Sequence, residues 1–287
     1  MRIGVCGLGL MGQGIASNFL TKGFDLTVWN RTAARAATLQ QAGAKVAESP
    51  EALAAASDVV VTCLADPAAV KEVGAGILAG AQPGLRWIET STIGRPTILE
   101  LASAAAARGV LVLEAPVTGS KVGAANGTLL AMTGGLPELH ESLLPVLGVF
   151  TNKAIHVGPI GSAAVMKLIG NTILTFMLEG LAEGAVVGAR AGVSLPKILE
   201  VIQASGFASP YWDFKGGQMA RRDFDAHFTI DLMKKDQALM LEEAAHRGVP
   251  MPGLAVLHQL TQMASAMGLG QKDIAAQLQA VERLAGE

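Results

Sequence analysis

The chain of 287 residues is long enough for one large domain or two modest ones with an ample core. Hydrophobic residues make up 51% of it, which excludes a disordered chain and favours a soluble, helix-rich one. The formal net charge is −2 with no long basic or acidic run. Neither nucleic-acid binding nor membrane-surface binding therefore gains electrostatic support.

The cysteines, histidines and apolar runs exclude further classes. Cys6 and Cys63 fall in predicted core strands as small buried hydrophobes, and the five histidines lack metal-ligand spacing, so we predict neither a disulfide nor a metal site. The apolar run Leu168–Leu178 is too short to span a bilayer, and we expect a helix buried in protein. No secretory signal pattern is found at the N-terminus, and we expect a cytoplasmic protein.

The first predicted elements surround the motif Gly7-x-Gly9-x-x-Gly12. A short apolar strand precedes it, a helix over Gln13–Lys22 follows, and a second strand covers Asp25–Asn30. Gly7 permits a tight turn, Gly9 lets the backbone approach a pyrophosphate, and Gly12 allows close packing of helix on strand. The motif therefore predicts dinucleotide binding, against the alternative of a glycine-rich turn without a ligand.

The end of the second strand bears on which dinucleotide binds. NAD sites usually place Asp or Glu there, but this chain has Asn30 followed by Arg31 and Thr32. The Arg31 guanidinium can pair with a 2′-phosphate, which a carboxylate would repel. We therefore predict NADP(H) as the cofactor, the alternative for Arg31 being a solvated loop residue. Arg35 could be a second phosphate contact or, equally, an ordinary surface residue.

Strands and helices alternate up to residue 161. The predicted strands are Arg2–Cys6, Leu26–Trp29, Val59–Leu64, Trp87–Glu89, Val110–Ala115, Leu129–Thr133 and Ala154–Val157. The predicted helices between them include Thr32–Ala42, Pro50–Ala56 and Arg95–Arg108. Apolar strands joined by helical crossovers predict an α/β fold with a Rossmann-type, doubly wound, mostly parallel sheet.

Only helices are predicted after Gly161, beginning with a long one over Ser162–Ala191. Further helices are predicted at Pro196–Ala204, Leu232–Arg247, Leu254–Met267 and Ile274–Ala285, with loops at Gly206–Asp213 and Arg221–Phe228. The pattern predicts an NADP-binding domain over 1–161 and a helical substrate and oligomerisation domain over 162–287. Because a long apolar helix commonly packs against a partner, we expect a homodimer or homotetramer.

Three later stretches are candidates for chemistry. The segment from Glu114 to Lys121 places hydroxyls and backbone amides around a glycine after a strand, which suits a small anion or an ordinary turn. Lys167 and Asn171 share one helix face, and a partly buried Lys167 would have a lowered pKa suited to acid catalysis. The alternative is a surface lysine. The stretch Phe228–Asp236 could supply a carboxylate that orients a catalytic group, or it could be only the charged start of a helix.

Four ordered motifs together resemble the β-hydroxyacid dehydrogenase family over essentially the whole chain. They are Gly7-Leu-Gly-Leu-Met-Gly12, Glu114-Ala-Pro-Val-Thr-Gly-Ser120, Gly158-Pro-Ile-Gly161 leading to Lys167-x-x-x-Asn171, and Lys235-Asp236. The chain is most similar to the NADPH-dependent glyoxylate/succinic semialdehyde reductases, sharing Val28-Trp29-Asn30-Arg31-Thr32, Leu64-Ala-Asp-Pro67 and Ser91-Thr92. It departs from them at Thr118 (usually serine), Ala163 (usually glycine), Asn126 (often aspartate) and the bulkier Tyr211-Trp212.

The resemblance implies a role for each matching residue. Lys167 would be the catalytic acid/base. The substrate would meet Thr118, Gly119, Ser120, Asn171, Phe228 and Asp236, and the cofactor would meet Gly7, Gly9, Leu10, Met11, Gly12, Asn30, Arg31, Thr32, Leu64, Thr92 and Lys235. The implied reaction is NADPH-dependent reduction of a small carboxylate-bearing aldehyde or keto acid, or the reverse oxidation of a β- or γ-hydroxy acid. Alternatives are an imine reductase on the same scaffold and a non-catalytic NADP-binding protein.

Overall fold

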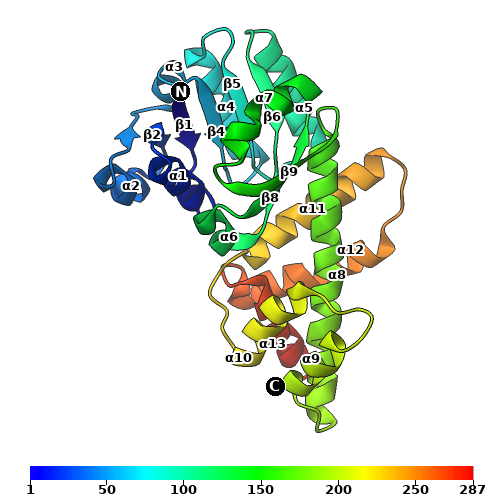
Figure 1. The fold of residues 1–287 in the computed structure, drawn as a ribbon. Coiled ribbons are helices and arrows are strands. Elements are labelled where there is room, and N and C mark those ends of the chain that lie inside the picture. Colours follow the sequence, from blue (N-terminus) through cyan, green and yellow to red (C-terminus); the bar gives the residue numbers. More distant parts are fainter. Residues whose placement is uncertain (287) are drawn as a thin grey trace. The chain divides into compact units, whose positions relative to one another are not determined.

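The computed structural model describes residues 1–286 and divides into two compact units, Met1–Leu168 and a second that begins at Ile169 (Figure 1). The first unit holds the strands β1 (Arg2–Cys6), β2 (Asp25–Trp29), β3 (Lys45–Val46), β4 (Val59–Thr62), β5 (Arg86–Glu89), β6 (Leu111–Glu114), β7 (Val117–Thr118), β8 (Leu129–Gly134) and β9 (Thr151–Gly158). Its helices are α1 (Gly12–Thr21), the 3-10 turn η1 (Ala33–Ala36), α2 (Ala37–Gln41), α3 (Pro50–Ala55), α4 (Pro67–Gly80), α5 (Arg95–Ala106), α6 (Ser120–Asn126) and α7 (Pro137–Leu147).

The sheet order is β3-β2-β1-β4-β5-β6-β8-β7, with β9 pairing β8. Strands β1 to β6 run parallel, whereas β8 is antiparallel to β6 and β7. This arrangement confirms the doubly wound, mostly parallel sheet. After β3 the chain returns to β4 on the other side of β1, so the order reverses between β1 and β4. Ligands of such sheets bind beyond the carboxyl ends of the strands at that reversal.

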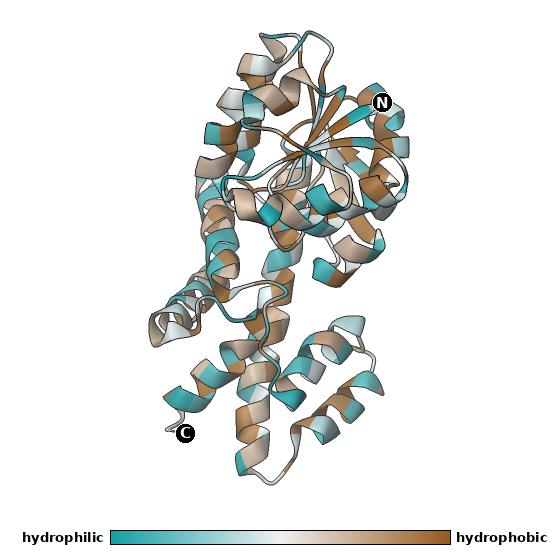
Figure 2. Ribbon diagram, turned by 90° about the vertical axis from the view of Figure 1, so that its left-hand side faces the viewer, coloured by the Kyte–Doolittle hydropathy of each residue, from teal (hydrophilic) through white to brown (hydrophobic). Residues whose placement is uncertain are grey.

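Two apolar cores cover the two faces of this sheet. Side chains alternate along a strand, so β1 sends Ile3 and Val5 into one core and Cys6 into the other. The first core contains Phe19, and the second contains the fully buried Trp87. Figure 2 shows the resulting concentration of hydrophobic residues along the central strands. The early strands are therefore continuous apolar runs, which is why the sequence pattern predicted them.

The unit from Ile169 onward is helical. Helix α8 (Ser162–Arg190) leads into it, followed by α9 (Leu195–Gln203), the π-helical segment η2 (Trp212–Gly216), α10 (Gly217–Arg221), α11 (Ile230–His246), α12 (Pro252–Ala264), the π-helical segment η3 (Ser265–Leu269), the 3-10 turn η4 (Ile274–Ala276) and α13 (Gln277–Leu284). The long helix predicted over Ser162–Ala191 is confirmed to within one residue.

Helix α8 is buried on one face only. Its residues Leu178, Leu181, Ala182 and Ala185 lie in the core of the helical unit. Ile173, Phe176 and Val187 are exposed to 55%, 46% and 69%, so the run Leu168–Leu178, which was expected to be buried in protein, is buried only in part within this chain. The helix is long and apolar enough to cross a membrane, a test that the core helix of a soluble protein also passes.

Several predicted boundaries were wrong. Tyr211 and Trp212 do not lie in a loop, because Trp212 begins η2 and its indole N–H donates to the Phe207 carbonyl at 3.0 Å. The helix predicted over Leu254–Met267 is present, as α12 to Ala264 and then as η3 from Ser265. Strands β3 and β7 have two residues each and were not predicted, because so short a segment carries no periodicity.

A buried ion pair lies within the helical unit. Lys215 Nζ is 2.6 Å from Asp273 Oδ1, and both side chains are almost fully buried. Lys215 also donates to Gln218 Oε1 at 2.8 Å. Asp273 accepts hydrogen bonds from the backbone amides of His227 and Phe228 at 2.9 and 3.1 Å. The pair therefore ties η2 to the chain segment that precedes α11.

Glu179 of α8 supplies a pH-dependent contribution to stability. Burial raises its pKa to about 7, and Glu183 one turn away adds repulsion. The unfolded carboxyl ionises near 4.5, so between pH 4.5 and 7 the native state holds a proton that the unfolded state has lost, and stability falls as pH rises. The free energy of unfolding of the wild type should therefore fall by roughly 2–3 kcal/mol from pH 4.5 to 7, and we expect this fall to be absent in Glu179→Gln.

Denaturant unfolding at several pH values measures this effect. Glu183→Gln is the matched control, because its carboxylate is exposed and its removal relieves only the repulsion. The prediction fails if the wild-type and Glu179→Gln proteins show parallel stability curves from pH 4.5 to 7.

Candidate functional site

The glycine motif joins β1 to α1 at the point where the strand order reverses. Gly7 has a φ of +97°, and a Cβ there would lie 2.2 Å from the Cys63 carbonyl oxygen. A Cβ at Gly12 would lie 1.9 Å from the Gly7 oxygen. A Cβ at Gly9 would meet no described atom within 4 Å, which leaves the backbone open to a ligand. These surroundings fit a dinucleotide pyrophosphate at the amino end of α1.

Asn30 joins the glycine loop to the next loop along the edge. Its Oδ1 accepts from the Leu8 amide at 2.9 Å, and its Nδ2 donates to the Thr32 carbonyl at 2.9 Å. The side chain thus holds both loops, a role that the sequence did not suggest. Arg31 and Thr32 are exposed beside it. The Asn30 amide is thus engaged within the chain, whereas Arg31 and Thr32, which were also predicted to meet the cofactor, are exposed.

Glu89 at the end of β5 holds the loop that carries Thr92. Its carboxylate accepts from the Ser91 amide at 2.7 Å and from the Thr62 hydroxyl at 2.6 Å. Burial raises the pKa of Glu89 to about 6, against the opposing effect of these hydrogen bonds. Ser91 Oγ in turn accepts from the Leu64 amide at 2.8 Å. The carboxyl ends of β4 and β5 are fixed together at the predicted cofactor edge.

The predicted anion-binding segment lies between β7 and α6. Thr118 ends β7, and Gly119 and Ser120 both have positive φ angles, +130° and +65°. A positive φ at a non-glycine residue is uncommon and tends to occur at ligand sites. Helix α6 begins at Ser120, so its first amides emerge beside the three residues that were predicted to receive a carboxylate.

Lys167 and Asn171 lie four positions apart on the continuous helix α8. The Lys167 side chain is half-buried, as the sequence predicted. Asn171 is buried and donates from Nδ2 to Asp236 Oδ2 at 2.6 Å. The other Asp236 oxygen is 2.9 Å from Lys235 Nζ. Asp236 therefore orients the Asn171 amide and pairs with Lys235, which brings three predicted residues together within the helical unit.

Two other predicted features occupy different places. Phe228 is half-buried and its amide is held by Asp273, a contact between residues 45 apart that no sequence motif signals. Tyr211 and Trp212 pack into or against the core of the helical unit.

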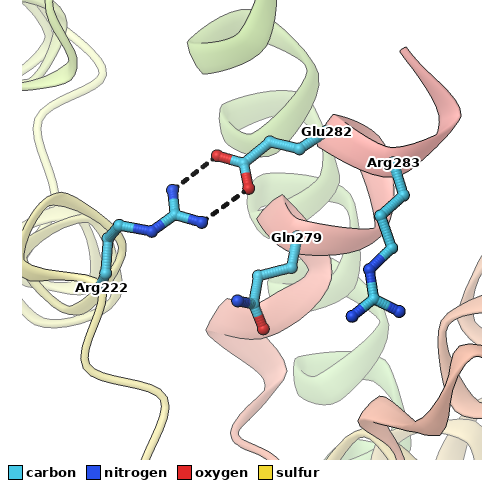
Figure 3. A pocket seen from close by; sticks show the side chains of 4 residues that line it. All are labelled: Arg222, Gln279, Glu282 and Arg283. Atoms are coloured by element: carbon cyan, nitrogen blue, oxygen red, sulfur yellow. Dashed lines mark hydrogen bonds and ion pairs between the residues drawn. The ribbon is translucent and has the colours of Figure 1, made fainter. Parts of the chain in front are cut away.

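A separate polar pocket of the helical unit contains none of the predicted residues. It is lined by Arg222, Gln279, Glu282 and Arg283 (Figure 3). Arg222 donates to both oxygens of Glu282 at 2.7 and 2.9 Å, whereas Arg283 donates to the Met267 carbonyl at 2.9 Å. Within residues 1–286 no cluster of three His, Cys, Asp or Glu side chains could hold a metal ion.

Family models match both halves of the chain. Residues 2–158 match the NAD-binding domain of 6-phosphogluconate dehydrogenase, and residues 161–281 match the NAD-binding domain of NADP-dependent 3-hydroxyisobutyrate dehydrogenase. The chain belongs to the 3-hydroxyisobutyrate (β-hydroxyacid) dehydrogenase family. It is therefore an NAD(P)-binding oxidoreductase of the hydroxyacid dehydrogenase type, and the resemblance found in the sequence is confirmed.

Several known proteins are similar to this chain over nearly their full length. Glyoxylate/succinic semialdehyde reductase 1 of Arabidopsis thaliana is 32% identical, covering 98% of this chain and 99% of that protein. The Mycobacterium tuberculosis 3-hydroxyisobutyrate dehydrogenase with L-serine is 28% identical with a TM-score of 0.89, over 98% of each chain. Psf3 in complex with NADP+ and 2-OPP is 27% identical with a TM-score of 0.88, over 97% of this chain and 99% of that one.

Proposed function

We propose that this protein is an NADPH-dependent reductase of a small aldehyde or keto acid that carries a carboxylate, of the glyoxylate or succinic semialdehyde type. The reverse reaction would oxidise a β- or γ-hydroxy acid. The observation that carries the proposal is the placement of Lys167 one helical turn from Asn171, whose amide is oriented by the buried Asp236. A protein that only binds a dinucleotide does not need this arrangement.

The residues divide the work of the reaction as follows. The chemistry that NADPH would supply here, when bound, is a hydride for the carbonyl carbon. Lys167 stabilises the negative charge that builds on the carbonyl oxygen and gives that oxygen a proton. Asn171 orients the same oxygen from the next turn of α8. Thr118, Gly119 and Ser120 bind the substrate carboxylate through hydroxyl and amide groups, which fixes the carbonyl for attack.

Preference for NADPH would rest on Arg31. We expect Arg31→Ala to raise the KM for NADPH by about 10–100-fold, because a charge-assisted hydrogen bond to phosphate contributes about 1.5–3 kcal/mol. The KM for NADH should stay within about twofold, since NADH lacks the 2′-phosphate. Initial rates with both cofactors measure this, with Lys71→Ala, which removes an exposed cation paired with Glu100 on a different segment, as the control. An equal rise in both KM values would contradict the assignment.

Assembly into a homodimer or homotetramer belongs to the same proposal. The exposed apolar face of α8, with Ile173, Phe176 and Val187, supports it, because single chains rarely leave such residues aligned in water. Size-exclusion chromatography with light scattering tests it, and a monomer at micromolar concentration would contradict it.

The function is tested by initial rates with NADPH and NADH against glyoxylate, succinic semialdehyde and a cyclic imine. NADPH-dependent turnover of either aldehyde acid supports the proposal. Turnover of the imine alone would assign the imine-reductase alternative. Binding of NADPH without turnover of any carbonyl or imine would assign the non-catalytic alternative.

A further inference from the structure

Glu114 is a buried carboxylate that the catalytic scheme above does not use. It ends β6, is 1% exposed, and pairs across the sheet with Gly134 of β8. Its Oε1 accepts from the Ala163 amide at 2.9 Å, and its Oε2 accepts from the Ala164 amide at 3.1 Å. Each oxygen thus accepts from an amide in the first turn of α8, where helix amides have no partner within the helix, and the Gly161 amide just before α8 also bonds to the carboxylate.

The surroundings of Glu114 are shaped for this contact. A Cβ at Gly134 would lie 2.1 Å from Glu114 Oε1, so only glycine leaves room for the carboxylate. Burial raises the pKa of Glu114, whereas the amides of the helix start and the charge of Arg95 favour the ionised form. An anion at a helix N-terminus also interacts favourably with the helix dipole. The carboxylate therefore joins the end of a sheet strand to the start of α8.

Lys167 follows Ala163 by four residues, one turn along the same helix and within the same compact unit. Thr118 follows Glu114 by four residues along the chain. One side chain therefore sits between the segment predicted to hold the substrate carboxylate and the helix that carries the proton donor. A shift of the first turn of α8 relative to β6 would break both hydrogen bonds of the Glu114 carboxylate.

We propose that Glu114 is a positioning residue that clamps the first turn of α8 to the end of β6 and so sets the placement of Lys167. This inference rests on the proposed function for the role of Lys167. The clamp itself is a contact that can be measured without any turnover.

The test uses the full chain with Glu114→Gln, which keeps the size of the side chain but offers only one acceptor for the two amides. We expect kcat to fall by about 10–100-fold, because a displacement of about 1 Å in a reacting group can cost that much. The Kd for NADPH should remain within twofold, and KM for the aldehyde acid should change less than kcat. Hydrogen exchange of residues 162–168 should become about tenfold faster or more as the amide contacts are lost.

Glu114→Asp keeps the charge but shortens the side chain, so it should show the same fall in kcat and the same faster exchange if the carboxylate must reach the helix amides. This variant also tests the clamp if Glu114→Gln does not fold. Glu138→Gln is the matched control, since Glu138 is an exposed carboxylate in the first turn of α7 and should change nothing. Unchanged exchange in the Glu114 variants overturns the clamp. Faster exchange with kcat within twofold of the wild type overturns the positioning role. If the wild type turns over no carbonyl compound, the proposed function fails, and the positioning role fails with it. Hydrogen exchange of residues 162–168 would still show whether Glu114 holds the first turn of α8.

Discussion

Replacing Lys167 with alanine is expected to lower kcat for the aldehyde acid by about 10²–10⁴, the usual contribution of a positioned acid. The loss should appear in kcat and kcat/KM alike, because the proton transfer and the charge stabilisation occur in the transition state. Binding of NADPH, measured by fluorescence titration, should remain within about twofold, since the predicted cofactor contacts lie on other segments.

Two further variants make the Lys167 result specific. Lys167→Met preserves most of the side-chain volume and should lose as much activity as the alanine variant, which separates the ammonium from simple packing. Lys197→Ala removes an exposed lysine of α9 that pairs with Glu200, and it should leave the rates unchanged. Turnover within threefold of the wild type in Lys167→Ala would refute its assignment as the proton donor.

The largest expected loss of stability follows from Asp273→Ala. This carboxylate is fully buried and accepts from Lys215 Nζ and from the amides of His227, Phe228 and Ala275. Removing it leaves a buried ammonium without its ion-pair partner, and breaking such a pair costs about 3–5 kcal/mol. Denaturant unfolding measures the loss. KM for the substrate should also rise, because Phe228 loses its backbone anchor.

An exposed ion pair provides the control for this experiment. Asp58 pairs with Arg2 at 2.7 Å, but both side chains are well exposed, so Asp58→Ala should cost no more than about 1 kcal/mol. Equal losses for the two variants would mean that burial of the Lys215–Asp273 pair does not govern its contribution.

The parts of the fold that were predictable are those with a local cause. Buried parallel strands are continuous apolar runs, and helix starts carry signals such as Ser49-Pro50, where the serine hydroxyl accepts from the Ala52 amide at 3.1 Å. The loop predicted over Gly206–Asp213 extends too far, because Trp212 and Asp213 already belong to the π-helical segment η2.

The parts of the site that were not predictable depend on distant contacts. Spacing placed Lys167 and Asn171 on one helix face, since both lie within one element. It could not reveal that Glu114 contacts an amide 49 residues away, or that Asp236 reaches back 65 residues to Asn171. Asp236 was named from its motif but without its partner, whereas Glu114 looks in sequence like an ordinary acidic residue at the end of a strand.

The two hydrogen bonds of Asn30 have a consequence for redesigning the enzyme's coenzyme choice. The obvious change toward NADH, Asn30→Asp, would keep an acceptor for the Leu8 amide but would face the Thr32 carbonyl with a second oxygen. The repulsion between these oxygens would destabilise the loop over positions 30 to 32. The new carboxylate needs that loop in place to accept hydrogen bonds from a ribose. An engineer who wants an NADH-dependent variant should therefore rebuild positions 30 to 32 as one unit.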